Sequence, residues 1–245
     1  MIQYEKLAEC LTTARKAVVF SGAGTSTRSG LPDFRSSQGL WTHYDPMALA
    51  SVEAMNTNRQ AFLEFYRYRI KSVKRAAPNA AHHILAEWEK HNLVKGVITQ
   101  NVDGFHQEAG SMNVIELHGS LRNVQCRRCM QVFSSDLLLE QERCPMCDGD
   151  LRPGVVLFGE LLPEGPMEEA RKLSTTCDLF IVLGSSLNVS PANLFPVDAY
   201  RNGAQLVIIN KETTQFDSVA SFVIHENLVD VLKEIHHILY GEGGF

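Results

Sequence analysis

Four short apolar runs in the chain each end at a small cluster of polar residues. The runs occupy residues 17–20, 97–98, 179–183 and 206–209. The clusters that follow are Ser21-Gly22-Ala23-Gly24, Thr99-Gln100-Asn101, Gly184-Ser185-Ser186 and Asn210. Continuous apolar runs are typical of parallel strands buried on both faces. Because ligands of open α/β sheets bind beyond the carboxyl ends of the strands, the pattern predicts one nucleotide-binding rim. Ordinary turn residues after strands are the alternative interpretation.

Apolar residues at helical spacing predict helices between and around these strands. The expected helices cover residues 4–15, residues 59–74, a segment that starts after Pro78-Asn79 and ends near Asn92, and a last helix from Leu228 that ends at Gly241. Residues 30–46 are rich in turn-forming residues, and so long a connection without regular structure indicates a functional loop.

Four of the six cysteines form two closely spaced pairs. Cys126 and Cys129, followed by Cys144 and Cys147, make the pattern C-x2-C-x14-C-x2-C. Zn2+ binds four thiolates in a tetrahedron, and each C-x2-C turn offers two of them. Four thiolates leave no open coordination position, so the sequence predicts one Zn2+ with a structural role and not a catalytic one.

These features predict an α/β fold: a doubly wound, parallel, Rossmann-like sheet with a helical insert and a small zinc-ribbon module. The expected nucleotide-binding domain comprises residues 1–37, 76–120 and 152–245. The helical insert comprises residues 38–75, and the zinc module comprises residues 121–151.

Composition and charge limit the classes of partner and the cellular compartment that we expect for the protein. The chain has 245 residues, 44% of them hydrophobic, and a net charge of −5. General nucleic-acid binders are usually basic, so we expect no specific nucleic-acid partner. The N-terminal residues lack the apolar segment of a signal peptide, and no apolar run approaches the roughly 20 residues that span a bilayer. We therefore expect a cytoplasmic protein without a membrane partner. The sequence does not define the oligomeric state, and a monomer is compatible with it.

The first polar cluster contains half of a dinucleotide-binding fingerprint. Gly22 and Gly24 follow a strand, and glycines at such a turn let backbone N–H groups approach a pyrophosphate. Thr27 stands where the third glycine of G-x-G-x-x-G is usual, and the acidic ribose-binding residue expected about 20 residues later has no evident candidate. The sequence therefore argues against an ordinary dehydrogenase site.

Several motifs follow one another along nearly the whole chain. They are Gly22-Ala23-Gly24-Thr25-Ser26, Gly30-Leu31-Pro32-Asp33-Phe34-Arg35, Thr99-Gln100-Asn101-Val102-Asp103, His118-Gly119, the two cysteine pairs, Phe158-Gly159-Glu160 and Gly184-Ser185-Ser186-Leu187. In this combination the chain resembles the sirtuins, which are NAD-dependent protein-lysine deacylases, and its length is similar to that of the compact bacterial members. The resemblance implies NAD as co-substrate, a structural Zn2+, and acylated-lysine proteins that bind as extended peptides.

The resemblance also implies roles for individual residues. The glycine loop would contact the pyrophosphate, residues 34–35 would cover the nicotinamide ribose, and residues 100–103 would hold the ribose and the carboxamide. The implied NAD contacts are Ala23, Gly24, Ser26, Thr27, Phe34, Arg35, Gln100, Asn101, Val102, Asp103, Ser185, Ser186, Asn210 and Leu228. The implied substrate contacts are Val155, Val156, Phe158 and Gly159, which would pair with the peptide backbone as a neighbouring strand.

His118 follows a largely apolar run and precedes a glycine. A histidine in such a place can be a packed core residue, but its ordinary pKa of about 6.5 also suits a general base at neutral pH. The resemblance implies that His118, Asn101 and Asp103 are catalytic. In that chemistry the acyl oxygen attacks the ribose as nicotinamide leaves, and His118 activates the ribose hydroxyl that captures the acyl group. The products are nicotinamide, deacylated lysine and 2′-O-acyl-ADP-ribose.

An arginine lies at the centre of an apolar stripe on the expected helix 59–74. Phe62, Phe65, Tyr66 and Val73 share this face with Arg69. A buried guanidinium needs an anionic partner, so Arg69 reaches solvent, pairs with a structural carboxylate, or binds an acidic acyl group together with Tyr66. The Tyr-x-x-Arg pattern resembles that of the sirtuins that remove succinyl and malonyl groups. It implies desuccinylase or demalonylase activity besides deacetylation.

Other functions stay open at this point. A mono-ADP-ribosyltransferase shares the first half of the chemistry, and a non-catalytic NAD sensor on the same fold would need no catalytic histidine. A zinc ribbon that binds nucleic acid is supported only by Arg122, Arg127 and Arg128 near the first cysteine pair. Acidic residues in the same module offset this charge, which favours a solvated mixed surface.

Overall fold

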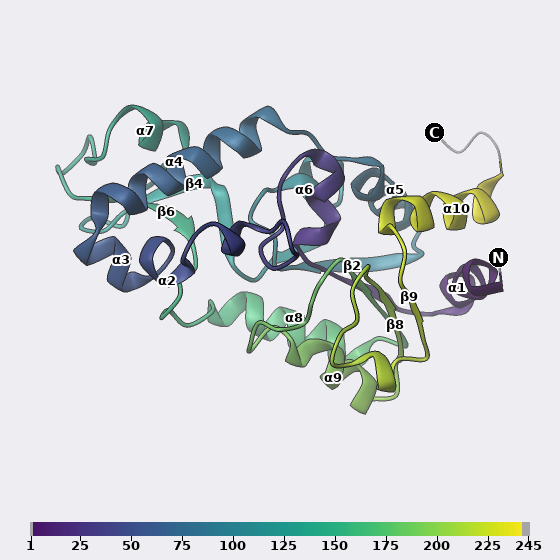
Figure 1. Cartoon of the computed structure of the whole chain (residues 1–245). Helices are drawn as coiled ribbons and strands as arrows, with labels where there is room; N and C mark the ends of the chain where they lie inside the picture. Colours follow the sequence, from purple (N-terminus) through teal and green to yellow (C-terminus); the bar gives the residue numbers. More distant parts are fainter. Residues whose placement is uncertain (1, 242–245) are drawn as a thin grey trace.

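The computed structural model describes residues 2–241 (Figure 1). Its elements in chain order are α1 (Ile2–Thr13), β1 (Ala17–Ser21), η1 (Ala23–Ser29), η2 (Leu40–Thr42), α2 (Pro46–Leu49), α3 (Val52–Thr57), α4 (Arg59–Arg75), α5 (Ala80–Lys90), β2 (Val94–Thr99), α6 (Phe105–Glu108), β3 (Val114–Glu116), β4 (Gly119–Cys126), β5 (Val132–Ser134), α7 (Asp136–Glu140), β6 (Leu151–Val155), α8 (Glu164–Thr176), β7 (Leu179–Leu183), α9 (Leu194–Arg201), β8 (Gln205–Ile209), η3 (Asp217–Val219), β9 (Phe222–Ile224) and α10 (Leu228–Tyr240). The four expected strands correspond to β1, β2, β7 and β8. The four expected helices correspond to α1, α4, α5 and α10.

The main sheet has six strands in the order β3-β2-β1-β7-β8-β9. All its neighbouring strands run parallel, which confirms the expected doubly wound sheet. Ser21, at the end of β1, is paired in register with Thr99 on one side and with Leu183 on the other. The chain winds away from β1 in both directions, and a crevice opens where such a sheet changes direction. The polar clusters after β1, β2 and β7 therefore meet at this crevice.

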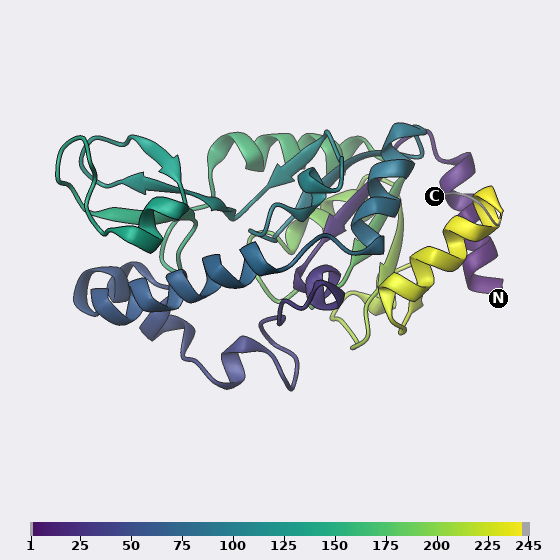
Figure 2. The ribbon, with the colours of Figure 1, turned by 90° about the horizontal axis from the view of Figure 1, so that it is seen from above.

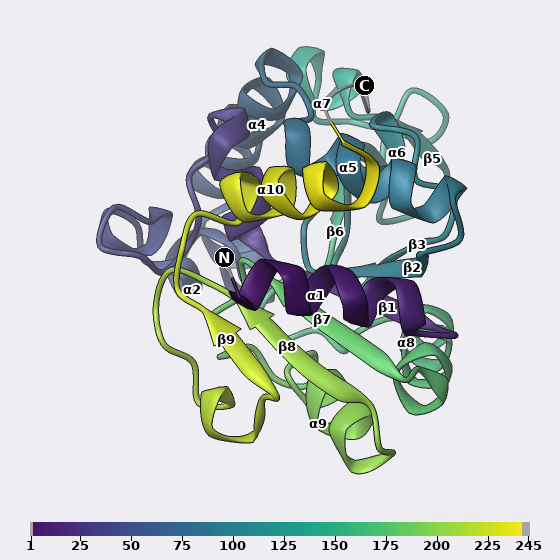
Figure 3. The ribbon, with the colours of Figure 1, turned by 90° about the vertical axis from the view of Figure 1, so that its right-hand side faces the viewer.

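Helices cover both faces of the main sheet. α1, α5 and α10 contribute Leu7, Trp88 and Leu232 to an apolar cluster on one face. α8 and α9 contribute Ala170 and Phe195 to the cluster on the other face. Figure 3 shows α1 and α10 side by side on the first face, with α8 and α9 on the opposite side. This coverage explains why the central strands are apolar along their whole length.

A smaller part of the molecule extends beyond one end of the main sheet (Figure 2). It contains an antiparallel sheet in the order β5-β4-β6 and the helices α2, α3, α4 and α7. Phe62 and Ile70 of α4 share one apolar core with Leu121, Val124 and Leu138. The helical insert and the cysteine-bearing module therefore stabilise each other.

The small sheet includes residues 119–120 and 152–155, which the sequence pattern groups with the nucleotide-binding domain. The pairing of β4 with β6 extends from Cys126 and Leu151, near the cysteine cluster, to Gly119 and Val155. The small sheet therefore reaches beyond the expected boundaries of the zinc module. The expected division into domains stays a prediction.

Side-chain caps begin two helices at the crevice. Asn79 accepts the backbone N–H of Ala81, and the side chain of His82 accepts the backbone N–H of Asn79, which forms a capping box at α5. Asn227 accepts the backbone N–H of Val229 at the start of α10. Within residues 2–241, no helix combines the length and the apolar character needed to cross a membrane.

Candidate active site

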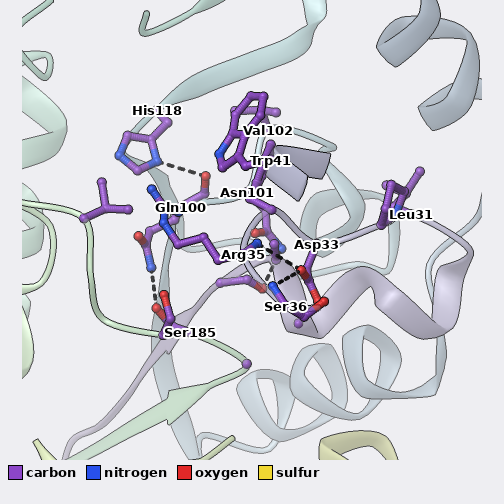
Figure 4. A pocket seen from close by; sticks show the side chains of 18 of the residues that line it. Leu31, Asp33, Arg35, Ser36, Trp41, Gln100, Asn101, Val102, His118 and Ser185 are labelled. Carbon is purple, nitrogen blue, oxygen red and sulfur yellow. Dashed lines mark hydrogen bonds between the residues drawn. The ribbon is translucent and has the colours of Figure 1, made fainter. Parts of the chain in front are cut away.

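A cavity of about 880 Å3 lies where β1, β2, β7 and β8 end, between the main sheet and the smaller part. Its volume is in the range of small-molecule and cofactor sites. Figure 4 shows part of the lining, with His118 and Gln100 on one side and the turn-rich segment around Asp33 and Arg35 on the other. The predicted site residues that line it are Ala23, Gly24, Thr27, Phe34, Arg35, Tyr66, Arg69, Gln100, Asn101, Val102, His118, Val155, Val156, Phe158, Gly159, Ser185, Ser186, Asn210 and Leu228.

Glycines bring two strand-end loops into backbone contact. Gly24 donates its N–H to the carbonyl oxygen of Gly184 at 2.9 Å. A Cβ at Gly24 would lie 2.7 Å from the Cα of Gly184, so no side chain fits there. Gly184 itself has φ +58, a conformation that favours glycine. The loop after β1 is thereby pressed against the loop after β7, and backbone N–H groups at such a turn suit a pyrophosphate.

The amide of Asn101 is held from two sides. Its Nδ2 donates to the carbonyl oxygen of Gly22 at 3.1 Å and to Oγ of Ser26 at 3.2 Å. Ser26 in turn donates to Oδ2 of Asp103 at 2.7 Å. Ser26 and Asp103 lie behind Asn101 and are not among the residues that line the cavity. Because the protein engages Nδ2, Asn101 presents its amide oxygen to a ligand.

Asp103 is a buried carboxylate with its own hydrogen bonds. The N–H of Phe105 donates to Oδ1 at 3.0 Å, and Ser26 donates to the other oxygen. Burial raises the pKa of Asp103, while these bonds and the positive charge of Arg69 oppose the rise. In this arrangement Asp103 anchors Ser26 and, through it, Asn101.

Gln100, in the loop after β2, is hydrogen-bonded to the loop after β7. Its Nε2 donates to Oγ of Ser185 at 2.8 Å, as Figure 4 shows. Ser185 also accepts the N–H of Leu187 at 3.3 Å. These bonds join the loop after β2 to the loop after β7 across the end of β1.

His118 lies between the strand-end rim and the small sheet. Its Nδ1 is 3.0 Å from the carbonyl oxygen of Gln100 (Figure 4). A carbonyl oxygen can only accept, so Nδ1 carries the proton and Nε2 is left to accept one. Burial lowers the pKa of His118; the bond to Gln100 opposes this effect, and the charge of Arg35 adds to it. The imidazole is therefore neutral at pH 7, as a general base requires.

The segment after β6 is fixed next to His118. The N–H of Val156 donates to the carbonyl oxygen of His118 at 2.9 Å. The guanidinium of Arg152 binds both carboxylate oxygens of Glu160, a bidentate and charge-assisted arrangement. Oε2 of Glu160 also accepts the N–H of Leu157 at 2.8 Å. Together with the N–H of Glu160, which donates to the carbonyl oxygen of Leu157 at 3.0 Å, these bonds close a turn over residues 157–160 and hold the backbone before it beside the cavity.

Arg69 is surrounded by aromatic rings in the cavity wall. Its Cζ lies 4.9 Å from the ring centroid of Phe34 and 5.9 Å from that of Phe65. Within the described part of the chain, no carboxylate forms an ion pair with Arg69. Burial lowers the pKa of Arg69, and the nearby Tyr66 and Asp103 oppose this shift. Burial also raises the pKa of Tyr66 to about 12, so its phenol stays protonated. The alternative in which Arg69 pairs with a structural carboxylate is therefore not found in the described residues.

The four paired cysteines fit a zinc ion. The Sγ atoms of Cys126, Cys129, Cys144 and Cys147 all lie within 4.8 Å of one another. Two of the sulfur separations are 3.5 and 3.7 Å. A tetrahedral zinc with Zn–S bonds of about 2.3 Å separates its sulfurs by about 3.8 Å. Gly149 leaves room for the cluster, since a Cβ there would lie 2.9 Å from Sγ of Cys126.

The sequence did not single out every residue of the site. Trp41 lines the cavity, and its ring centroid lies 5.2 Å from that of Phe34, 6.0 Å from Phe65 and 6.3 Å from Phe158. A tryptophan within the turn-rich segment 30–46 is the signal that could have indicated it. Trp41 joins the loop over the cavity to α4 and to the segment after β6.

This geometry defines a class of protein: an α/β protein with a dinucleotide-type rim, a neutral histidine beside an extended segment, and a four-cysteine metal centre. The model of the Sir2 family matches residues 22–191. NAD-dependent protein deacetylase 1 of Geobacillus kaustophilus is 52% identical over 231 residues, which cover 94% of this chain and 96% of that protein. The NAD-dependent protein deacetylase of Oceanobacillus iheyensis is 47% identical over 224 residues, with 91% and 95% covered.

Solved structures of Sir2 proteins are also similar to this chain. A Sir2 complex with p53 peptide and NAD+ matches with a TM-score of 0.87 and 36% identity, covering 96% of this chain and 97% of that one. Sir2Tm bound to a propionylated peptide matches with a TM-score of 0.88 and 35% identity, covering 96% and 98%. The chain belongs to the Sir2 family, the sirtuins, as its motifs led us to expect.

Proposed function

We propose that the protein is an NAD-dependent protein-lysine deacetylase. It transfers the acyl group of a modified lysine to ADP-ribose and releases nicotinamide and 2′-O-acyl-ADP-ribose. The observation that carries this proposal is His118, which lines the cavity with Nε2 available to accept a proton and whose carbonyl oxygen binds the N–H of Val156 in the segment 155–159. The two relatives named NAD-dependent protein deacetylase support it.

The rim would hold NAD along the crevice. Backbone groups around Ala23 and Gly24 would bind the pyrophosphate, because the glycine contact leaves no side chain in the way. Ser185 and Ser186 would contact the phosphates, and Asn210 would contact the adenosine ribose. Leu228, at the start of α10, would pack near the adenine.

The other end of the rim would hold the reacting part of NAD. Phe34 and Arg35 would close over the nicotinamide ribose, and Thr27 lines the same cavity. Asn101 would orient a hydroxyl through its amide oxygen, while Ser26 and Asp103 would fix that amide from behind. Gln100 and Val102 would complete the wall around the ribose and the carboxamide.

His118 would act as general base at Nε2. NAD supplies a ribose carbon whose bond to the positively charged nicotinamide ring breaks readily. His118 would take a proton from the ribose hydroxyl that captures the acyl group. The bond from Nδ1 to the carbonyl of Gln100 fixes the ring and stabilises the charge that the imidazole then carries.

The acylated lysine would arrive on an extended peptide that pairs with the segment 155–159. Backbone pairing gives affinity for many sequences, because it reads the main chain and not the side chains. Val155, Val156, Phe158 and Gly159 line the cavity from this segment. Solved Sir2 structures that hold a p53 peptide and a propionylated peptide support a peptide as the substrate.

The zinc would serve the structure of the smaller part. Four thiolates saturate the ion, so it offers no position for a substrate. β4 and β6 run from Cys126 and Leu151 at the metal toward Gly119 and Val155 at the cavity. Cysteines arranged for metal binding fit a reducing compartment, which supports the expected cytoplasmic location.

A finer proposal concerns the acyl group. Arg69 is a cation in the cavity wall without an ion-paired carboxylate in the described chain, and the protonated phenol of Tyr66 is one helical turn away. A succinyl or malonyl carboxylate would supply the missing anion. We therefore propose that the protein removes acidic acyl groups besides acetyl.

One experiment tests the proposal against its rivals. The zinc-loaded protein is incubated with NAD and with acetyl-, succinyl- and malonyl-lysine peptides, and nicotinamide and ADP-ribose products are identified by mass spectrometry. We expect 2′-O-acyl-ADP-ribose. A protein carrying ADP-ribose would instead indicate a mono-ADP-ribosyltransferase, and binding of NAD without nicotinamide release would indicate a sensor. The absence of nucleic-acid and membrane partners stays a prediction.

A further inference from the structure

Two buried histidines lie directly behind the NAD rim and outside the cavity. His82, on α5, and His106, on α6, have ring centroids 4.9 Å apart at an interplanar angle of 63°. His82 is completely buried, and His106 is 1% exposed. Burial lowers the pKa of His82 to about 2 and that of His106 to about 4. Both rings are therefore neutral at pH 7, and each carries one proton on one of its two nitrogens.

The hydrogen bonds of His82 define its tautomer. Its Nδ1 accepts the backbone N–H of Asn79 at 3.1 Å, so Nδ1 has no proton and Nε2 has one. Within the described residues, this buried Nε2–H has no acceptor. His82 therefore offers an unused donor beside the ring of His106.

The hydrogen bonds of His106 connect it to Ser21 and Thr99, at the ends of β1 and β2. Its Nε2 is 2.8 Å from Oγ of Ser21, and Ser21 donates to Oγ1 of Thr99 at 2.8 Å. Thr99 Oγ1 also accepts the backbone N–H of Asn101 at 3.0 Å. If Ser21 donates forward to Thr99, the proton of His106 must be on Nε2, and its Nδ1 is an acceptor without a donor in the described residues. The unused donor of His82 and the unused acceptor of His106 are then complementary.

If the hydrogen bonds among Thr99, Ser21 and His106 ran in the opposite direction, two neighbouring histidine rings would each hold an unsatisfied donor. If Thr99 donated to Ser21 and Ser21 to His106, His106 would carry its proton on Nδ1. Both histidines would then present a buried N–H without an acceptor, and each unsatisfied group costs about 1–3 kcal/mol. In the forward direction a donor on one ring and an acceptor on the other remain instead, and these attract each other where two donors would repel.

We propose that His106, protonated on Nε2 alone and packed against the neutral ring of His82, forms a directional relay through Ser21 and Thr99 that positions Asn101 for the proposed deacylation reaction. The relay rests on the proposed function, because Asn101 is the group that it serves. Asn79, whose backbone N–H binds His82, also donates from its side chain to the carbonyl oxygen of Thr25 at 2.8 Å. The same residue thus holds η1, which follows the glycine loop, and the histidine pair behind it.

Kinetics of two variants test the positioning role of His106. His106→Leu keeps the volume of the ring and removes the donor to Ser21, whereas His106→Gln offers an amide N–H in its place. We expect kcat of His106→Leu to fall between about tenfold and a hundredfold, as for small misplacements of a reacting group, with KM for NAD and peptide nearly unchanged. Gln should restore most of kcat. His83→Leu, which changes the exposed neighbour of His82, is the matched control and should leave kcat unchanged.

A variant at Ser21 and a spectroscopic measurement complete the test. Ser21→Ala interrupts the relay at its middle and should reproduce the loss of kcat, even where His106→Leu does not fold. Long-range 1H–15N NMR of the unmodified protein should show both histidines neutral and protonated on Nε2. A proton on Nδ1 of His106, or normal kcat in folded Ser21→Ala, would overturn the relay. Absence of nicotinamide release by the unmodified protein would instead contradict the proposed function and leave the NMR result valid.

Discussion

The two ends of the cavity differ in how far the protein satisfies its own polar groups. At the nucleotide end, the polar side chains bond to one another: Gln100 to Ser185, and Asn101 to Ser26. At the acyl end, Arg69 is covered by the rings of Phe34 and Phe65 and has no ion-paired carboxylate in the described chain.

This difference separates positioning from selection. Groups that are already hydrogen-bonded keep one geometry, and a pre-formed geometry is what a reacting ribose requires. A cation that lacks an anion instead favours any ligand that brings one. The nucleotide end should therefore set the rate of the reaction, and the acyl end should set the choice of acyl group. The following predictions test each half of this comparison.

Loss of the metal should have the largest effect, because it removes the support of the acyl end. Structural zinc sites contribute on the order of 10 kcal/mol of binding free energy, which the fold of the small sheet uses. We expect Cys144→Ala to lower the melting temperature strongly and to abolish turnover with every acyl peptide. Thermal unfolding, together with zinc analysis by mass spectrometry, measures this.

Cys10→Ala is the control for the zinc prediction, since Cys10 lies outside the four-cysteine cluster. It should keep one zinc per chain and full activity. Zinc-free protein with normal turnover would show that the small sheet supports the acyl end without metal.

Replacement of His118 should come next, because it removes the base and leaves both ends in place. General bases contribute about 10²- to 10⁴-fold to turnover, so His118→Ala should lose activity on acetyl and acidic acyl peptides by this factor. Binding of NAD and of peptide, measured by calorimetry, should stay close to normal. Near-normal turnover in His118→Ala would remove His118 from the mechanism.

Acid should destabilise the nucleotide end through its buried histidines. The pKa values of His82 and His106 in the folded chain, about 2 and about 4, lie below the ordinary value, so the unfolded chain binds more protons. Their contribution to stability is complete above about pH 6.5 and is lost as the pH falls. Between pH 7 and pH 5 the loss should be roughly 2 kcal/mol for each histidine.

Urea unfolding at several pH values measures this loss. His106→Gln removes one of the two titrating groups and should reduce the pH dependence by about half. An unchanged slope in that variant would mean that other groups cause the acid sensitivity.

The sequence predicts the nucleotide end better than the acyl end, for a physical reason. Parallel strands that are buried on both faces produce apolar runs, and their ends bring Ser21, Gln100 and Ser185 to one edge without further information. The acyl end is assembled from α4, the loop before it and the segment after β6, which are distant in sequence and carry no shared period. Arg69 stood out from its helix pattern, but its aromatic neighbour Phe34 comes from another element.

The tautomers of His82 and His106, behind the site, could not be predicted from the sequence either. His82 and His106 belong to short helical patterns in which a histidine indicates packing alone. Their roles depend on which nitrogen meets Asn79 and which meets Ser21, and only the packing of α5 against α6 decides this.

The smallest and most selective effect is expected from Arg69→Met. Methionine keeps an apolar stem between Phe34 and Phe65 and removes the charge, so the wall of the cavity is preserved. Loss of a charge-assisted hydrogen bond costs about 1–3 kcal/mol, and kcat/KM for succinyl-lysine peptides should fall by about 5- to 150-fold. The value for acetyl-lysine peptides should change little, since acetyl brings no anion. Lys71→Met, which removes an exposed charge from the same helix, should alter neither. Equal losses on both peptides would make Arg69 a structural residue, and the selection of acidic acyl groups would then have no basis at this end of the cavity.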